Sequence, residues 1–338
     1  MMKVLSMSNR HSEWDTGFGR REFLKRTAAL GTGLAMAGLV RADDPPKLGE
    51  LSTRVLGRTK RKVTVLGLGT APLGESRGDV QAGIKVFQAA LDRGVNYVDT
   101  ARIYGNAEEI LGHLVPQRRD KLFLVTKCST DNAKQAEIPL TESLRQLKTD
   151  HVDLCHIHAI GDKNLDRVTA ADGILPWLVK QKEAGKVCHI GISGHNRPHN
   201  FVKMMETDQI DVVMCVMNYA DRNVYDFETK VLPEARKRNL GVAAMKVYVG
   251  IKGGFSNHRK GHVGCVTEPD RLPQALAYSL DLEGVHVAVV GPFTLEQSIQ
   301  NVELALKYKP LTDKERAALL AHGKELATQI GPRYGPAA

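Results

Sequence analysis

Four side chains that can move a proton or stabilise charge end or follow three separate apolar runs of the sequence. Asp99 ends the run YVD and Tyr104 follows five residues later, while Lys127 ends FLVTK and His158 ends VDLCHIH. Reducing a carbonyl group by hydride transfer needs a proton donor at the oxygen and a pocket that stabilises the developing alkoxide. A lysine beside a phenol stabilises the phenolate and lowers the phenol's pKa, an imidazole can orient the carbonyl, and a carboxylate offsets the burial of the ammonium. The set predicts acid–base chemistry if the fold brings the four side chains together.

The chain from Leu51 onward alternates between short apolar runs rich in β-branched residues and longer segments of helical period. This alternation is typical of parallel strands joined by helical crossovers. Eight units favour an α/β fold with a single domain, the (β/α)8 TIM barrel, over an open doubly wound sheet. The run Leu51–Lys62 is expected to form an N-terminal hairpin that closes the barrel floor.

The expected strands are Val63–Leu68, Tyr97–Thr100, Leu122–Thr126, Val152–His158, Val187–Ile192, Val212–Met217, Val242–Met245 and Val285–Val290. The expected helices are Val80–Arg93, Ala107–Leu114, Ile138–Leu147, Ile174–Ala184, Asn200–Glu206, Phe227–Arg238, Pro273–Asp281 and Leu295–Leu306, followed by a terminal helix over Leu311–Ala327. In a barrel of this kind the chemistry lies where the strands end. Taken singly, the four residues have ordinary roles, such as a helix cap for Asp99 or a core histidine for His158. Their joint occurrence at three adjacent strand ends favours a catalytic site.

Four motifs resemble those of the aldo/keto reductase family: VDTARIYGNAEEILG at 98–112, FLVTK at 123–127, VDLCHIH at 152–158 and GISGH at 191–195. The resemblance extends from Leu51 to Leu306. It implies an NAD(P)-dependent oxidoreductase that reduces an aldehyde or ketone to an alcohol, or catalyses the reverse reaction. It also implies that Asp99, Tyr104, Lys127 and His158 are the catalytic residues, with Tyr104 as the general acid/base.

The cofactor side of the site resembles the family less evenly. The chain has no G-x-G-x-x-G fingerprint, as expected for a nucleotide that lies across a barrel mouth. Gly194, Met214 and Met245 stand where the family often has Asn, Gln and an aromatic ring. The cofactor-binding residues that the resemblance implies are Gly69, Thr70, Ser193, Met245, Lys246, Gly291, Thr294, Gln297 and Asn301.

The resemblance favours NADP(H), while NAD(H) stays open because residues 291–300 contain no basic side chain to select the 2′-phosphate. The loop Lys252–Lys260 contains the basic residues Lys252, His258, Arg259 and Lys260. It either folds over the cofactor phosphates or is a solvated basic loop.

The N-terminal segment resembles a twin-arginine signal peptide. RREFLK at 20–25 precedes the uncharged stretch TAALGTGLAMAGLV at 27–40, and Ala42 marks a plausible cleavage point. Fourteen helical residues rise only about 21 Å, too short for a hydrocarbon core of about 30 Å, so no stable membrane span is expected. We expect residues 1–42 to be the signal, 43–50 a linker and 51–330 the catalytic barrel. The twin-arginine translocase is then a partner during export to the periplasm. The alternative is a basic amphipathic helix docked on the domain.

The composition excludes several other classes. With 42% hydrophobic and 25% charged residues, the chain is neither mostly disordered nor a multi-span membrane protein. The net charge of +9 includes +4 from residues 1–42 (seven basic against three acidic), so the rest carries only +5, which suits an anionic small ligand better than nucleic acid. The five cysteines form no C-x-x-C pair and predict neither a disulfide framework nor a zinc site.

Two alternatives to a reductase remain. One is a nucleotide-binding barrel that acts as a redox sensor or binds a protein partner without turnover, which the altered nicotinamide positions suggest. The other is a metal-dependent hydrolase, because His156 and His158 form an H-x-H pair. That reading requires more ligands at other strand ends, and His195 is the single obvious candidate, so no metal is expected.

Overall fold

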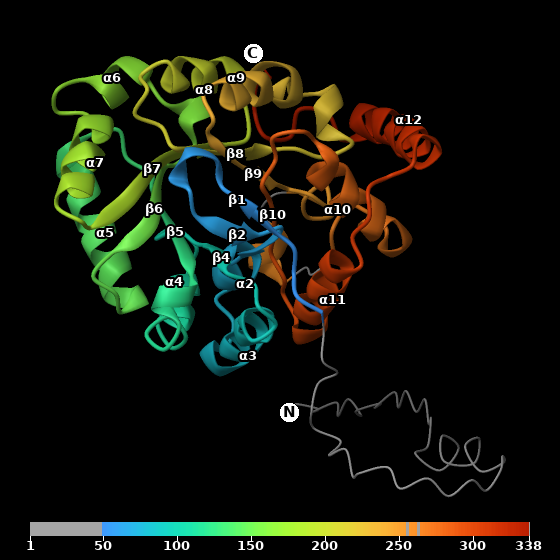
Figure 1. The fold of residues 1–338 in the computed structure, drawn as a ribbon, viewed down its shortest axis with the longest axis horizontal. Coiled ribbons are helices and arrows are strands. Elements are labelled where there is room, and N and C mark those ends of the chain that lie inside the picture. Colours follow the sequence, from blue (N-terminus) through green and yellow to red (C-terminus); the bar gives the residue numbers. More distant parts are fainter. Residues whose placement is uncertain (1–48, 255–256, 262–263, 338) are drawn as a thin grey trace, which may run out of the picture. The chain divides into compact units, whose positions relative to one another are not determined.

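The computed structural model describes residues 49–254, 257–261 and 264–337, so the expected signal peptide, its expected cleavage point and most of the expected linker lie outside the described residues. Eight parallel strands close into a barrel in the order β10-β3-β4-β5-β6-β7-β8-β9, with helices around the outside (Figure 1). The expected (β/α)8 barrel is confirmed. The barrel strands are β3 (Leu66–Gly69), β4 (Tyr97–Asp99), β5 (Phe123–Cys128), β6 (Val152–Ile157), β7 (Val187–Gly194), β8 (Val212–Val216), β9 (Gly241–Met245) and β10 (Val287–Val290).

Every expected helix is present, most with shifted ends, and Leu295–Leu306 has the expected bounds. The α-helices are α2 (Ala71–Ser76), α3 (Val80–Leu91), α4 (Ala107–Leu111), α5 (Ala133–Leu147), α6 (Leu165–Thr169), α7 (Ile174–Glu183), α8 (Pro198–Met205), α9 (Leu232–Lys237), α10 (Leu272–Asp281), α11 (Leu295–Leu306) and α12 (Asp313–Ile330). Helix α5 begins earlier than expected because Asn132 caps it by accepting a hydrogen bond from the Gln135 amide. A π-helix over Phe227–Val231 precedes α9.

The expected first strand is divided between two structures. Strands β1 (Thr53–Val55) and β2 (Lys62–Thr64) form an antiparallel hairpin, and the barrel strand begins only at Leu66. The hairpin is fixed to the barrel by ion pairs of Arg58 with Asp211 (3.1 Å) and of Arg61 with Asp153 (3.4 Å). Both aspartates lie at the starting ends of barrel strands. The hairpin therefore closes the floor, opposite the strand ends that carry the expected site (Figure 1).

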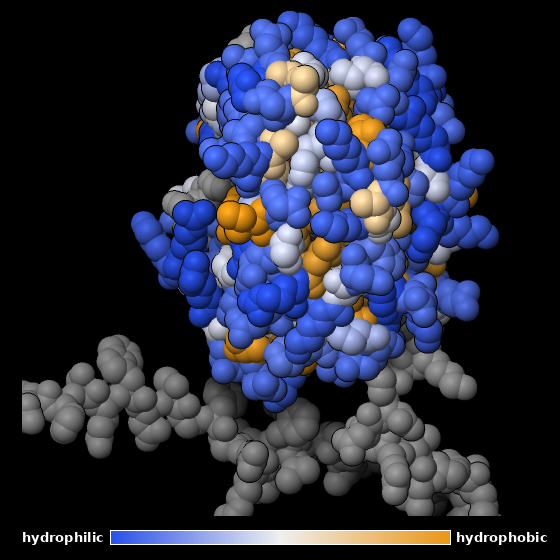
Figure 2. Space-filling model, turned by 90° about the vertical axis from the view of Figure 1, so that its left-hand side faces the viewer, coloured by the Kyte–Doolittle hydropathy of each residue, from blue (hydrophilic) through white to orange (hydrophobic). Residues whose placement is uncertain are grey.

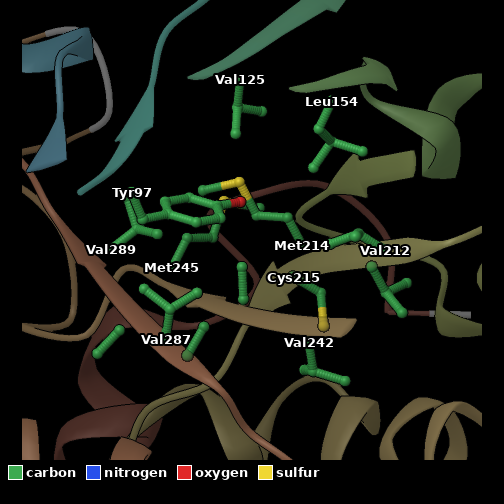
Figure 3. Close-up of a cluster of buried hydrophobic side chains, with 14 of the residues drawn as sticks. Tyr97, Val125, Leu154, Val212, Met214, Cys215, Val242, Met245, Val287 and Val289 are labelled. Carbon is green, nitrogen blue, oxygen red and sulfur yellow. The ribbon is translucent and has the colours of Figure 1, made fainter. Parts of the chain in front are cut away.

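The barrel interior is filled by side chains from most of the strands. Tyr97, Val125, Leu154, Met214 and Val289 converge in Figure 3. The Tyr97 ring is fully buried and stacks on the Phe123 ring, with the ring centroids 5.5 Å apart. It passes so close to β3 that a Cβ on Gly67 would lie 2.9 Å from its Cδ1 atom. The interior is thus a packed core, and the open space begins above it.

The outer face over α5, α6 and α7 is mostly hydrophilic, with apolar side chains scattered between the charged ones (Figure 2). Such scattering is ordinary for a helix-covered barrel.

Candidate active site

The four expected catalytic residues meet at the mouth of the barrel. Asp99 ends β4, Lys127 lies near the end of β5, and His158 directly follows β6. The Lys127 ammonium donates to both Asp99 carboxylate oxygens at 2.7 Å and to the Thr100 carbonyl at 2.9 Å. It also lies 4.7 Å from the centroid of the Tyr104 ring, and the His158 ring meets that ring edge-on with the centroids 5.9 Å apart.

Burial sets the protonation of this cluster. It raises the pKa of Asp99 and lowers the pKa of Lys127, and their mutual contact opposes both shifts. It also lowers the pKa of His158 to about 3, helped by the nearby positive charge of Lys127. The imidazole is therefore neutral in the ordinary pH range, and its Nδ1 atom lies 3.2 Å from the Ser129 hydroxyl.

Tyr104 differs from the expectation. A neighbouring lysine should lower the pKa of the phenol, but burial and the negative charges of Asp99 and Glu75 raise it well above its ordinary value. The Lys127 ammonium lies over the face of the Tyr104 ring, and it donates its hydrogen bonds to Asp99 and to the Thr100 carbonyl. Tyr104 is thus held as a neutral acid that can donate a proton.

A half-buried ion pair fixes the loop that carries Tyr104. Arg102 pairs with Glu108 at 2.8 Å, and Glu108 also accepts a hydrogen bond from the Thr126 hydroxyl, next to Lys127 in β5. Gly105 turns the loop with φ 57°, and a Cβ there would lie 2.1 Å from the Gly74 carbonyl oxygen. The loop is thereby fastened to both α2 and β5.

A cavity of about 620 Å³ opens above the cluster. Asp99, Tyr104 and His158 line it together with six of the expected cofactor residues, namely Gly69, Met245, Lys246, Gly291, Gln297 and Asn301. Met214, which stands where the family often has Gln, lines it as well.

The other three expected cofactor residues lie behind the cavity wall. The Thr70 hydroxyl donates to the backbone carbonyl of Asp99 at 3.0 Å. The Thr294 hydroxyl caps α11 by accepting a hydrogen bond from the backbone amide of Gln297 at 3.2 Å. Ser193 lies near the end of β7 and is 1% exposed. Its hydroxyl has no hydrogen-bond partner among the described residues.

Several lining residues are absent from the sequence-based expectation. Glu75, on the unexpected helix α2, pairs with Arg259 at 2.8 Å across the cavity. Arg333 and Tyr334 come from the segment after α12 and also line it. Pro72 and Gly74 make α2 look like a loop, and nothing in the sequence around Arg333 signals a cavity. Of the expected basic loop, Arg259 reaches the cavity, while residues 255–256 and the His258 side chain lie outside the described residues.

Within the described ranges, no three His, Cys, Asp or Glu side chains gather closely enough to hold a metal ion. None of the described helices combines the length and apolar character needed to cross a bilayer.

The fold and the site define a barrel with an acid–base cluster at its mouth, and comparison with known proteins agrees. The sequence profile of the Aldo/keto reductase family matches residues 65–271. The chain therefore belongs to the aldo/keto reductase family, and it is an oxidoreductase.

Relatives extend the likeness over nearly their whole lengths. The chain is 26% identical over 317 residues to L-galactose dehydrogenase of Arabidopsis thaliana, covering 83% of this chain and 98% of that protein. It is 30% identical over 304 residues to the uncharacterized oxidoreductase YrpG of Bacillus subtilis, covering 74% of this chain and 91% of that protein. An aldo/keto reductase of Klebsiella pneumoniae, solved in complex with NADP and acetate, shares the fold with a TM-score of 0.64 at 23% identity over 85% of this chain and 99% of that chain.

Proposed function

We propose that this protein is an NADP(H)-dependent reductase of aldehydes or ketones, with Tyr104 as the general acid. The observation that carries the proposal is the juxtaposition of the Asp99–Lys127 pair, the protonated Tyr104 and the neutral His158 at one cavity. When bound, the nicotinamide would supply the hydride for the carbonyl carbon. Tyr104 gives its proton to the carbonyl oxygen, and the neutral imidazole of His158 orients that oxygen.

The cavity fits a dinucleotide. Glycines 69 and 291 line it where the backbone must come close to a ligand. The buried Ser193 hydroxyl, near the end of β7, has no hydrogen-bond partner among the described residues. The carboxamide of a nicotinamide ring is a group of the right kind for that hydroxyl. Lys246 and Arg259, the latter paired with Glu75, place basic groups in the same cavity, which suits phosphate groups. The NADP held by the Klebsiella pneumoniae structure supports NADP(H) as the cofactor here.

The test is to record NADPH and NADH consumption by the purified chain with a panel of aldehydes and ketones. We expect turnover with at least one carbonyl compound and a preference for NADPH. Tight nucleotide binding without turnover of any compound would contradict the proposal and favour a redox sensor or partner-binding barrel.

We further propose that residues 1–42 are a twin-arginine signal that exports the folded barrel to the periplasm. Arg20-Arg21 and the weakly hydrophobic stretch 27–40 support this proposal. Because this pathway carries folded proteins, the nucleotide would bind before export. Protein from the exported fraction should then release NADP on denaturation, and nucleotide-free protein there would contradict the idea.

A further inference from the structure

The C-terminal segment from Gly331 to Ala337 forms part of the cavity wall. It lies beyond the residues that the family profile matches. The Arg197 amide, in the loop after β7, donates to the Pro336 carbonyl at 3.3 Å. The Tyr225 hydroxyl, in the loop after β8, accepts from the Tyr334 amide at 2.9 Å and donates to the Gly335 carbonyl at 3.1 Å. These contacts fix the segment on the β7–β8 side of the mouth.

This segment places one guanidinium group in the cavity. Arg333 donates from Nη2 to Asp221 at 2.8 Å, and its guanidinium lies 4.8 Å from the centroid of the Tyr334 ring. Asp221 accepts a hydrogen bond from the side-chain amide of Asn218 at 2.7 Å, and the same side-chain amide donates to the Lys246 carbonyl at 2.9 Å. The Arg333 side chain is 17% exposed, whereas that of Asp221 is only 1% exposed. The buried carboxylate of Asp221 therefore holds the guanidinium from its buried side.

The contact with Asp221 leaves donors of Arg333 unused. A guanidinium carries five N–H donors in a planar fork that matches a carboxylate. The Nε atom of Arg333 is buried and has no hydrogen-bond partner among the described residues. Arg333 lines the cavity and its side chain is 17% exposed, so guanidinium donors other than Nε are open to an anion there. The positive charge of Lys246, which lines the same cavity, adds to the attraction.

Arg333 lies away from the part of the cavity that is expected to bind the cofactor phosphates. Strand β10 and helix α11 carry Gly291, Gln297 and Asn301, whereas the C-terminal segment is tied to the loops after β7 and β8. In the closed order of strands, β7 and β8 are not neighbours of β10. The Tyr334 ring, next to Arg333, packs 5.1 Å from the His195 ring, which follows β7. The guanidinium thus belongs to the half of the cavity nearer to the strand that carries His158.

We propose that Arg333 binds the carboxylate of the substrate, so that this reductase prefers aldehydes or ketones that also carry an acid group. This inference rests on the proposed function and deepens it by naming a substrate class. Tyr334 and Asp221 are positioning residues that hold the guanidinium in place.

The test compares an acid with its neutral ester. The steady-state rates with 4-carboxybenzaldehyde and with its methyl ester are measured for the wild type and for Arg333→Gln. A hydrogen bond to a charged group is worth about 1.5–3 kcal/mol, so kcat/KM for the acid should fall about 10- to 150-fold, mainly through KM. The ester should change by less than about threefold. Arg333→Lys should recover part of the loss, because it keeps the charge but not the fork.

Arg316→Gln is the matched control. Arg316 pairs with Asp281 at 2.7 Å and lies 5.8 Å from the centroid of the Tyr278 ring, the same kind of arrangement away from the cavity. Arg316→Gln should leave the ratio of kcat/KM for the acid to kcat/KM for the ester unchanged. Melting temperatures of both variants separate a folding defect from a lost contact.

Two further measurements keep the outcomes distinct. If Arg333→Gln weakens NADPH binding and slows the acid and the ester equally, the guanidinium serves the cofactor phosphates and the proposal is overturned. Titration calorimetry with benzoate, an unreactive carboxylate, should show binding to the wild type and at least tenfold weaker binding to Arg333→Gln. Equal binding of benzoate to the wild type and to Arg333→Gln would overturn the carboxylate proposal. A lack of turnover of every carbonyl compound would instead count against the reductase function.

Discussion

Tyr104 is held in its neutral, protonated form by burial and by two nearby carboxylates. A phenol that stays protonated can give its proton to a new alkoxide, whereas oxidation of an alcohol requires the phenolate as the base. Lys127 provides the opposing influence, but its hydrogen bonds go to Asp99 and the Thr100 carbonyl. The resting form of Tyr104 is thus the one that reduction uses, while the reverse reaction needs the phenolate.

Protonation of His158 should not affect catalysis near neutral pH. Burial and Lys127 lower the pKa of this imidazole to about 3, so it stays neutral until the pH falls toward that value. We expect kcat for reduction to show no inflection from His158 between about pH 5 and pH 7, where an ordinary imidazole with a pKa of about 6.5 would titrate. The measurement is a pH–rate profile. An inflection near pH 6.5 that disappears in His158→Asn would contradict the assignment.

The Asp99–Lys127 pair should contribute to stability only as a pair. Asp99→Asn leaves a buried ammonium without its counter-charge and should lower the free energy of unfolding by about 3–5 kcal/mol. Adding Lys127→Met removes that charge, so the double variant should be more stable than Asp99→Asn alone. Urea unfolding of the four proteins measures the coupling. Strictly additive losses would show that the two groups do not interact as the 2.7 Å contact indicates.

At the scale of the elements, Asp211 connects the floor hairpin to the barrel. It accepts from Arg58 at 3.1 Å, from Lys182 at 2.9 Å and from the Ile190 amide at 3.0 Å. Burial alone would raise the pKa of Asp211, but hydrogen bonds from His189, Ile190 and Lys182 outweigh it and hold the pKa well below its ordinary value. A depressed carboxyl pKa stabilises the fold above the unfolded-state pKa of about 3.9, and that stabilisation is lost as the pH falls toward the folded-state pKa.

Asp211→Asn should therefore cost about 1–3 kcal/mol of unfolding free energy at neutral pH. The difference from the wild type should shrink as the pH falls below about 4, because the wild-type carboxyl then protonates as well. Chemical unfolding at a series of pH values measures this difference. Glu142→Gln, which alters an exposed helix-surface pair with Arg145, serves as the control and should have little effect. A deficit for Asp211→Asn that is independent of pH would contradict the role given to its charge.

The sequence predicts the elements that form the barrel, because their apolar runs and helical periods are strong local signals. It predicts the positions of Asp99, Lys127 and His158 because each ends such a run, and that of Tyr104 because it follows the first run by five residues. It does not predict that β2 and β3 separate at Val65, since the whole segment is equally apolar and only pairing with β1 divides it. Nor does it predict Arg333 in the cavity, because that placement depends on contacts with Tyr225 and Asp221, far away in the sequence.

At the scale of the whole molecule, export should depend on the paired arginines at the front of the chain. Changing Arg20→Lys together with Arg21→Lys preserves the charge but removes the guanidinium pair of the RREFLK motif. We expect the precursor to stay in the cytoplasm, as followed by fractionation and immunoblotting. Lys25→Arg, a charge-preserving change in the same segment outside the paired arginines, is the control. Normal periplasmic accumulation of the double variant would contradict the twin-arginine proposal.

The most direct test of the account is Tyr104→Phe, assayed with NADPH and the best carbonyl substrate of the wild type. The change removes one hydroxyl group and keeps the ring, so melting temperature and NADPH affinity should stay close to those of the wild type. Loss of the general acid should lower kcat by about 10²–10⁴-fold. A variant that keeps kcat within about threefold of the wild type would contradict the role of Tyr104 and, with it, the catalytic mechanism proposed for this barrel.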